Sequence, residues 1–166
     1  MAAPEYPPGH ASAYASLGLC GVVGELAARC GKWQLRESLS DREEALTKLG
    51  DICRQIAAAA AAFGVRLSDL GPALRQPRNL CLSSTADQVV LRMVAAAGDV
   101  AARASEAFST DRSLAQIRSD QAGRLGELLA FVRVFAAEAG GSLGSVLKAD
   151  ADRRSAVAGQ ELVGRG

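Results

Sequence analysis

The chain has 166 residues, a formal net charge of +1, 49% apolar residues and 22% charged residues. Such a length and composition are typical of one globular domain with its own core. Because the net charge is close to zero, no overall field draws the chain toward nucleic acid or an anionic membrane, and we expect neither as a partner. Aromatic residues make up only 4% and alanine dominates, which favours helix over sheet.

The first two predicted helices follow a proline-rich arm. Residues 1–12 hold three of the five prolines and predict a flexible N-terminus. A first helix is expected from Tyr14 to about Arg36. A second is expected from an N-cap at 40–41 to about residue 63, with Gly64 as its C-terminal cap. Its buried face is predicted from three-and-four spacing to hold Leu46, Leu49, Ile52, Cys53, Ile56, Ala60 and Phe63.

Two further helices are predicted in the second half of the chain. A connector at 64–85, with a short helical turn at 67–70, leads into a third helix over 86–108. Ser109-Thr110-Asp111 separates it from a fourth helix over 112–139, which Gly140-Gly141 ends. We expect residues 1–166 to form one helical domain, with a polar tail that frays from Lys148 and is flexible over about 151–166.

The cysteines do not form a metal-binding pattern. There is no C-x-x-C pair, and the one histidine, His10, lies in the N-terminal arm, so a zinc site is not expected. The sequence predicts four small buried residues in a reducing cytoplasm, namely Cys20, Cys30, Cys53 and Cys81. No signal peptide is recognised, and the apolar run at 56–63 is too short to span a bilayer. We therefore expect a cytoplasmic protein.

The two halves of the chain carry similar short segments. GELAAR at 24–29 aligns with GDVAAR at 98–103, and LGDI at 49–52 aligns with LGEL at 125–128. The two segments are separated by nearly the same distance in each half, which predicts an internal repeat. Duplicated helical hairpins bury their apolar faces by stacking, so the expected fold is an all-α four-helix bundle built from two tandem hairpins.

The first half resembles the MazG family of nucleotide pyrophosphohydrolases. LGLCGVVGEL at 17–26 is similar to the first metal-binding helix of that family, and KLGD at 48–51 with FGVRL at 63–67 is similar to the second. The resemblance covers 13–80 as a first repeat and 86–150 as a second, more divergent one. It implies an all-α fold that hydrolyses nucleoside triphosphates to monophosphate and pyrophosphate with Mg²⁺.

The ligand positions of that family are only half kept. Two carboxylate pairs on facing helices would converge on Mg²⁺, which prefers oxygen ligands. Aligned on the family, these positions are Val22, Glu25, Lys48 and Asp51 in the first half and Ala96, Asp99, Arg124 and Glu127 in the second. Both halves therefore have an apolar residue, an acid, a cation and an acid. A protonated lysine or arginine offers no lone pair and repels a metal, so Mg²⁺ binding is expected to be weak or absent.

An acid–cation–acid order at spacing i, i+4, i+7 also occurs in both halves, at Glu44, Lys48 and Asp51 and at Asp120, Arg124 and Glu127. Three interpretations stay open. Lys48 and Arg124 replace the metal by bridging to the acids of the facing helix, Glu25 and Asp99. Alternatively, these are solvated surface pairs, each contributing a few tenths of a kcal/mol. In the third, Glu25, Glu44 and Asp51 remain as a reduced metal site.

Three functions follow from these interpretations. The first is a MazG-like protein with degenerate metal sites, inactive or weakly active, that binds a nucleotide or has a regulatory role. The second is an active Mg²⁺-dependent pyrophosphohydrolase with the reduced ligand set, and the third is a non-catalytic helical module that binds a protein or a second copy of itself. Lys32 and Trp33 are the candidate nucleotide-binding residues, although a lone tryptophan at helical spacing is more often part of a core or interface.

Overall fold

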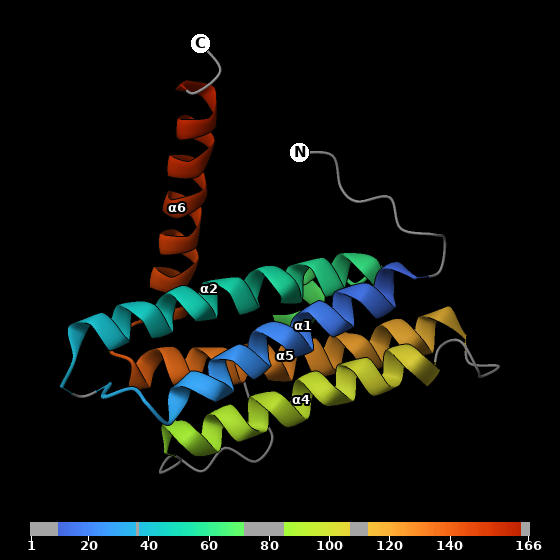
Figure 1. Cartoon of the computed structure of the whole chain (residues 1–166). Helices are drawn as coiled ribbons and strands as arrows, with labels where there is room; N and C mark the ends of the chain where they lie inside the picture. Colours follow the sequence, from blue (N-terminus) through green and yellow to red (C-terminus); the bar gives the residue numbers. More distant parts are fainter. Residues whose placement is uncertain (1–9, 36, 72–84, 107–112, 164–166) are drawn as a thin grey trace.

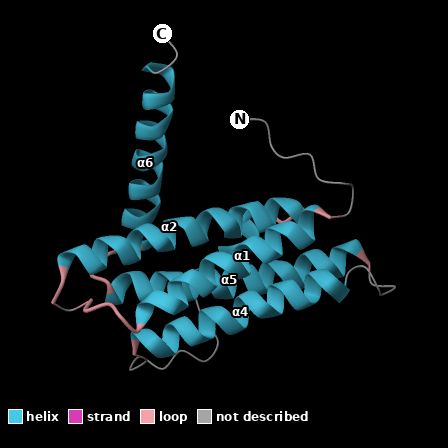
Figure 2. Ribbon diagram, viewed as in Figure 1, coloured by secondary structure: helices cyan, strands magenta, loops and turns pink. Residues whose placement is uncertain are grey.

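The computed structural model describes residues 10–35, 37–71, 85–106 and 113–163. These parts of the chain are all-helical, and five α-helices pack together (Figures 1 and 2). The elements are α1 (Ala11–Cys30), α2 (Leu39–Ala62), the 3₁₀ helix η1 (Leu67–Leu70), α4 (Ala86–Glu106), α5 (Leu114–Glu138) and α6 (Leu143–Val163).

Local sequence signals explain the ends of α2. The Ser38 side chain accepts a hydrogen bond from the backbone N–H of Asp41 over 3.2 Å, so the N-cap lies two residues before the predicted one. At the other end Gly64 has φ of +66°, and the N–H of Val65 donates to the carbonyl oxygen of Ala60 over 2.8 Å. A left-handed residue followed by this hydrogen bond is a Schellman cap, so the predicted role of Gly64 is confirmed.

A side-chain cap and a glycine with positive φ also mark the two ends of α5. The Ser113 side chain and that of Gln116 form a capping box at its start. Gly140 has φ of +76°, and the N–H of Gly141 donates to the carbonyl oxygen of Ala136 over 2.8 Å. The predicted end of the fourth helix at Gly140-Gly141 is therefore confirmed, and so is the short helical turn at 67–70.

Four of the helices form a closed ring of contacts. Helix α1 packs against α2 and α4, and α5 packs against α4 and α2. Figure 1 shows that each of these neighbouring pairs is antiparallel, whereas α2 and α4 run in the same direction. The largest completely buried side chains come from all four helices and include Leu19, Leu26, Leu49, Ile52, Ile56, Met93, Leu125, Leu128 and Phe135.

The fifth helix was not expected from the sequence. Helix α6 runs from Leu143 to Val163 and so includes residues 151–163, for which the sequence predicts a flexible tail. It leaves α5 at an angle of 92°, contacts α2 and α5 with its first part, and then extends away from the other helices (Figure 1). Alanine-rich sequence favours the helix, and ion pairs described below hold its first part on α2. Residues 164–166 lie outside the described residues.

Two smaller differences concern the first helix. It begins at Ala11, so residues 11 and 12 are helical and not part of an extended arm, while residues 1–9 lie outside the described residues. It ends at Cys30, six residues before the predicted end, and Gly31 follows as its C-cap. The predicted break at 109–111 also lies outside the described residues.

Candidate functional site

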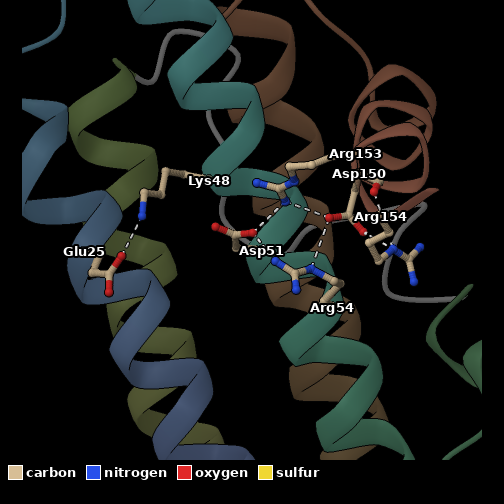
Figure 3. Close-up of polar contacts among 7 residues, drawn as sticks. All are labelled: Glu25, Lys48, Asp51, Arg54, Asp150, Arg153 and Arg154. Carbon is tan, nitrogen blue, oxygen red and sulfur yellow. Dashed lines mark hydrogen bonds and ion pairs between the residues drawn. The ribbon is translucent and has the colours of Figure 1, made fainter. Parts of the chain in front are cut away.

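Two ion pairs join neighbouring helices at matching places in the two halves. Lys48 on α2 donates from Nζ to Oε2 of Glu25 on α1 over 2.7 Å. Arg124 on α5 donates from Nη1 to Oδ2 of Asp99 on α4, also over 2.7 Å. These are the cation-to-acid contacts of the first of the three interpretations given above. Figure 3 shows the first pair bridging α1 and α2.

The exposure of these side chains limits their contribution to stability. The acids are the more exposed partners, with 60% exposure for Glu25 and 55% for Asp99, whereas Lys48 is 21% exposed. Ion pairs in such surroundings contribute about 1 kcal/mol or less. Each cation binds the carboxylate of the facing helix, so that this carboxylate is no longer free, and it places a positive charge beside it.

Asp51 bonds to a residue of α6 and does not join the ion pair between Lys48 and Glu25. Its Oδ1 accepts a hydrogen bond from Nη2 of Arg153 over 2.8 Å and also pairs with Arg54, one turn further along α2. Aligned on the family, Glu25 and Asp51 are ligand positions on facing helices, so the sequence predicts that they lie opposite each other. The structure instead gives the second acid of the first half two arginine partners of its own (Figure 3).

These contacts belong to a five-residue cluster centred on Asp150, which we call the Asp150 network: Asp51, Arg54, Asp150, Arg153 and Arg154 (Figure 3). The Asp150 side chain is 5% exposed, and its carboxylate lies 3.1 Å from Nε of Arg54, 2.8 Å from Nη2 of Arg153 and 3.2 Å from Nε of Arg154. Hydrogen bonds to Asp150 and Asp51 raise the pKa of the Arg153 guanidinium. The network therefore fixes α6 to α2.

The Asp150 network was not predicted from the sequence, although the sequence contains a signal for it. Asp150, Arg153 and Arg154 are spaced i, i+3, i+4, which places the acid and both cations on one helix face. Gly50 explains why α6 can cross α2 at this place. A β-carbon added to Gly50 would lie 3.2 Å from that of Asp150, so the absence of a side chain on this glycine allows α6 to pack closely against α2.

The remaining predicted residues make a separate contact. The indole Nε1 of Trp33 donates to Oε2 of Glu44 over 3.1 Å, and Arg29 pairs with the other oxygen of the same carboxylate. Trp33 is partly buried and packs against the core, while Lys32 is exposed. Glu44 therefore bonds the residues that follow α1 and does not join Glu25. Glu127 is partly buried, and no ion pair to it is found in the described part of the chain.

The carboxylates do not fit a magnesium site. Among the described residues, no three His, Cys, Asp or Glu side chains form a group that could hold a metal ion. Glu25, Glu44 and Asp51, the reduced ligand set, are each bonded to a different cation, respectively Lys48, Arg29, and the Arg54–Arg153 pair. Ammonium and guanidinium groups hold the oxygens that Mg²⁺ would need as ligands.

Two of the cysteines are buried thiols, as the sequence predicted. Burial, followed by a contact with Asp87, raises the pKa of Cys30 to about 11. Burial, with a smaller contribution from the charge of Asp150, raises the pKa of Cys53 to about 12. Cys20 is only partly buried, and its Sγ donates to the carbonyl oxygen of Ala97 over 3.4 Å. Cys81 lies outside the described residues.

A loss of stability at alkaline pH is expected from these thiols. An exposed thiol ionises near pH 9.0, whereas Cys53 stays protonated in the folded chain up to about 12. Between these values the folded state binds more protons than the unfolded state, so the free energy of unfolding falls as the pH rises. Urea unfolding of the parent and of Cys53→Ala, at pH values of about 8 and about 10.5, should show the larger loss in the parent. Equal losses in both proteins would contradict this assignment.

Comparisons with known proteins gave no match to a family model, to a curated protein or to a solved structure. The class that the described residues define is an all-helical protein with five α-helices packed together. The likeness to the MazG family rests on the sequence segments quoted above.

Proposed function

We propose that this chain is a MazG-like helical protein in which ion pairs have replaced the metal, and that it has a regulatory, nucleotide-binding role without appreciable hydrolysis. The observation that carries the proposal is the pair of matching interhelical contacts, Lys48 with Glu25 and Arg124 with Asp99. In both halves a cation stands where the family resemblance implies a ligand carboxylate. In both, it neutralises the acid on the facing helix.

The arrangement of the helices supports the two-hairpin origin on which this proposal depends. If α1–α2 and α4–α5 are repeated hairpins of a four-helix bundle, a two-fold axis should relate α1 to α4 and α2 to α5. Both of these pairs are in contact, and both are antiparallel in Figure 1, as a two-fold axis perpendicular to the helices requires. The aligned leucines of the two LG segments, Leu49 and Leu125, are both completely buried.

Ion pairs in both halves support the loss of hydrolysis. Hydrolysis of a nucleoside triphosphate needs groups that neutralise phosphate charge and position a water molecule. The first half engages Glu25 and Asp51 with cations, and the second engages Asp99. This favours the degenerate protein over an active enzyme with a reduced ligand set, since the three acids of that set bind three separate groups of cations.

Purified protein is therefore expected to release no pyrophosphate from a panel of ribo- and deoxynucleoside triphosphates in Mg²⁺ or Mn²⁺. The measurement is pyrophosphate release at high enzyme concentration, beside equilibrium dialysis of the same nucleotides. Binding without turnover would support the proposed role. Turnover on the order of 1 per second or faster, as in ordinary enzymes, would overturn it. Neither binding nor turnover for any nucleotide would favour the interaction module instead.

A further inference from the structure

Helix α6 is attached to the rest of the molecule through a small contact area. Among residues 143–156 only two side chains are buried, those of Val146 and Asp150, which lie one turn apart. The side chains of Leu143 and Arg153 are partly exposed, and the others in this stretch are exposed. Beyond it the helix extends away from the other four (Figure 1). A helix that buries so little of its surface is expected to open more readily than the core helices.

The core of the bundle does not depend on α6. The largest fully buried side chains of the described residues come from α1, α2, η1, α4 and α5, and none of them belongs to α6. The four long helices also form a closed ring of contacts without it. Their apolar packing should therefore persist when α6 moves away.

The contacts that hold α6 on α2 are largely ionic, and solvent reaches them. Arg54, Arg153 and Arg154 bond the Asp150 carboxylate, and all three arginine side chains are at least 39% exposed. Dissolved salt screens ion pairs with exposed partners, whereas it has little effect on an apolar core. The attachment of α6 is therefore expected to weaken as the ionic strength rises.

The link between α5 and α6 is suited to a hinge. It contains Gly140, which has φ of +76°, and Gly141 directly after it. Hinges are formed by a few residues at the ends of elements that absorb changes in φ and ψ, and glycine has the widest choice of these angles. A rotation at this link would move α6 without changing the path of α5.

Helix α6 covers a flank of α2 that carries a thiol. Gly50 and Cys53 are three positions apart, so they lie on one side of α2. A β-carbon added to Gly50 would lie 3.2 Å from that of Asp150, which places α6 directly on this side. Cys53 is buried, and after burial the charge of Asp150 is the second cause of its raised pKa. The thiol therefore lies near the buried carboxylate that anchors α6.

We propose that α6 is an ion-pair latch on α2, which opens as a unit about Gly140-Gly141 while the four other helices stay packed, and whose opening exposes the Cys53 thiol. A rise in ionic strength favours the open state, because it weakens the bonds of the Asp150 network. The latch makes access to a buried thiol depend on the solution around the protein. The proposal rests on the contacts of α6 and is independent of nucleotide binding and of the family resemblance.

The test is a short pulse of N-ethylmaleimide on the full chain, followed by digestion and peptide mass spectrometry. A pulse that modifies a small fraction of the protein reports the labelling of Cys53 and Cys30 separately in one sample. Cys30 is the internal control, because it is equally buried at 7% exposure but contacts Asp87 of α4. Raising NaCl from about 0.02 M to about 0.5 M should speed the labelling of Cys53 by at least about threefold and leave that of Cys30 unchanged.

Two variants on α6 test the role of the network. Asp150→Ala should speed the labelling of Cys53 by at least about tenfold at low salt, remove its salt dependence and leave Cys30 unchanged. The control is Asp152→Ala, which removes an exposed acid that pairs with Lys148, and it should leave both rates as in the parent. Circular dichroism checks that each variant keeps its helices, and the salt series of the parent tests the latch even if Asp150→Ala does not fold.

The urea dependence of labelling separates opening of the latch from global unfolding. Release of α6 exposes little surface, so the labelling rate of Cys53 should rise far less steeply with urea than the unfolded fraction measured by circular dichroism. An equally steep dependence would show that Cys53 is exposed only when the whole chain unfolds, and would overturn the proposal. Equal acceleration of both thiols by Asp150→Ala, or labelling of Cys53 that salt does not change, would overturn it as well.

Discussion

Replacing Asp150 by alanine is expected to release α6 from α2 and to lower the free energy of unfolding by about 2 kcal/mol. The carboxylate is 5% exposed and bonds Arg54, Arg153 and Arg154, so its removal leaves three guanidinium groups without their shared partner. These arginines are partly exposed and regain water, which keeps the loss below that of a fully buried ion pair. Urea unfolding measures the loss, and amide hydrogen exchange should show faster exchange over α6 than over α1 and α4.

The matched control lies on the same helix. Asp152 is 66% exposed and pairs only with Lys148 one turn before it. Asp152→Ala should therefore change the free energy of unfolding by no more than about 0.5 kcal/mol. If Asp150→Ala and Asp152→Ala give equal effects, or if hydrogen exchange over α6 is unchanged, then the network does not anchor this helix.

Leu49→Ala and Leu125→Ala are expected to produce the largest losses of stability, about 3 kcal/mol each. Both side chains are completely buried, one on α2 and one on α5, at the same place in the LG segments of the two halves. Each truncation removes apolar contact area and leaves a cavity in the core that the helices share. Similar losses from denaturant unfolding would be consistent with equivalent positions in a repeated hairpin.

Leu67→Ala is the reference for this comparison. Its side chain is 63% exposed on η1, so the change should lower the free energy of unfolding by less than about 0.5 kcal/mol. A loss below about 1 kcal/mol for either Leu49→Ala or Leu125→Ala would show that the helix concerned does not contribute to a common core.

The helical fold could be predicted from sequence to the extent that local signals determine it. Three-and-four spacing placed α2, α4 and α5 to within two residues at nearly every end, because the same apolar residues that form the stripe are the ones that become buried. Gly64 and Gly140 marked helix ends correctly, because each has a positive φ that glycine adopts without strain. The early end of α1 at Cys30 was missed, since the sequence remains compatible with helix beyond Gly31.

The part of the fold that could not be predicted depends on contacts between distant residues. Residues 148–163 are polar and were expected to fray, but a buried carboxylate at Asp150 meets Arg54, almost a hundred positions earlier in the sequence. No periodicity within the tail indicates that contact. The angle between α5 and α6 follows from the same packing and from Gly140-Gly141, and nothing in the tail alone specifies it.

The candidate site was likewise predictable in part. The contacts of Lys48 with Glu25 and of Arg124 with Asp99 were one of three arrangements that helical spacing and the alignment of the two halves left open. The partners of Asp51 could not be predicted, because Arg153 comes from the C-terminal segment that was expected to be flexible. Glu44 was grouped with Glu25 and Asp51 by spacing, yet it bonds Trp33 across the turn that follows α1. Spacing identifies the helix face on which a residue lies, but it does not identify the neighbouring residue that will bond to it.

The most direct test of the proposed replacement of metal by ion pairs is a magnesium titration by isothermal calorimetry. The parent is compared with the triple change Val22→Glu, Lys48→Glu and Arg153→Ala, and with Arg153→Ala alone as its control. The triple change supplies two carboxylates beside Glu25, removes the competing ammonium and frees Asp51 from one of its arginines. We expect no measurable binding by the parent or the control, and binding with a Kd of about 1 mM or tighter by the triple variant. Binding by the parent as tight as by the triple variant, or none by either, would contradict the proposal that Lys48 stands in the place of a metal ligand.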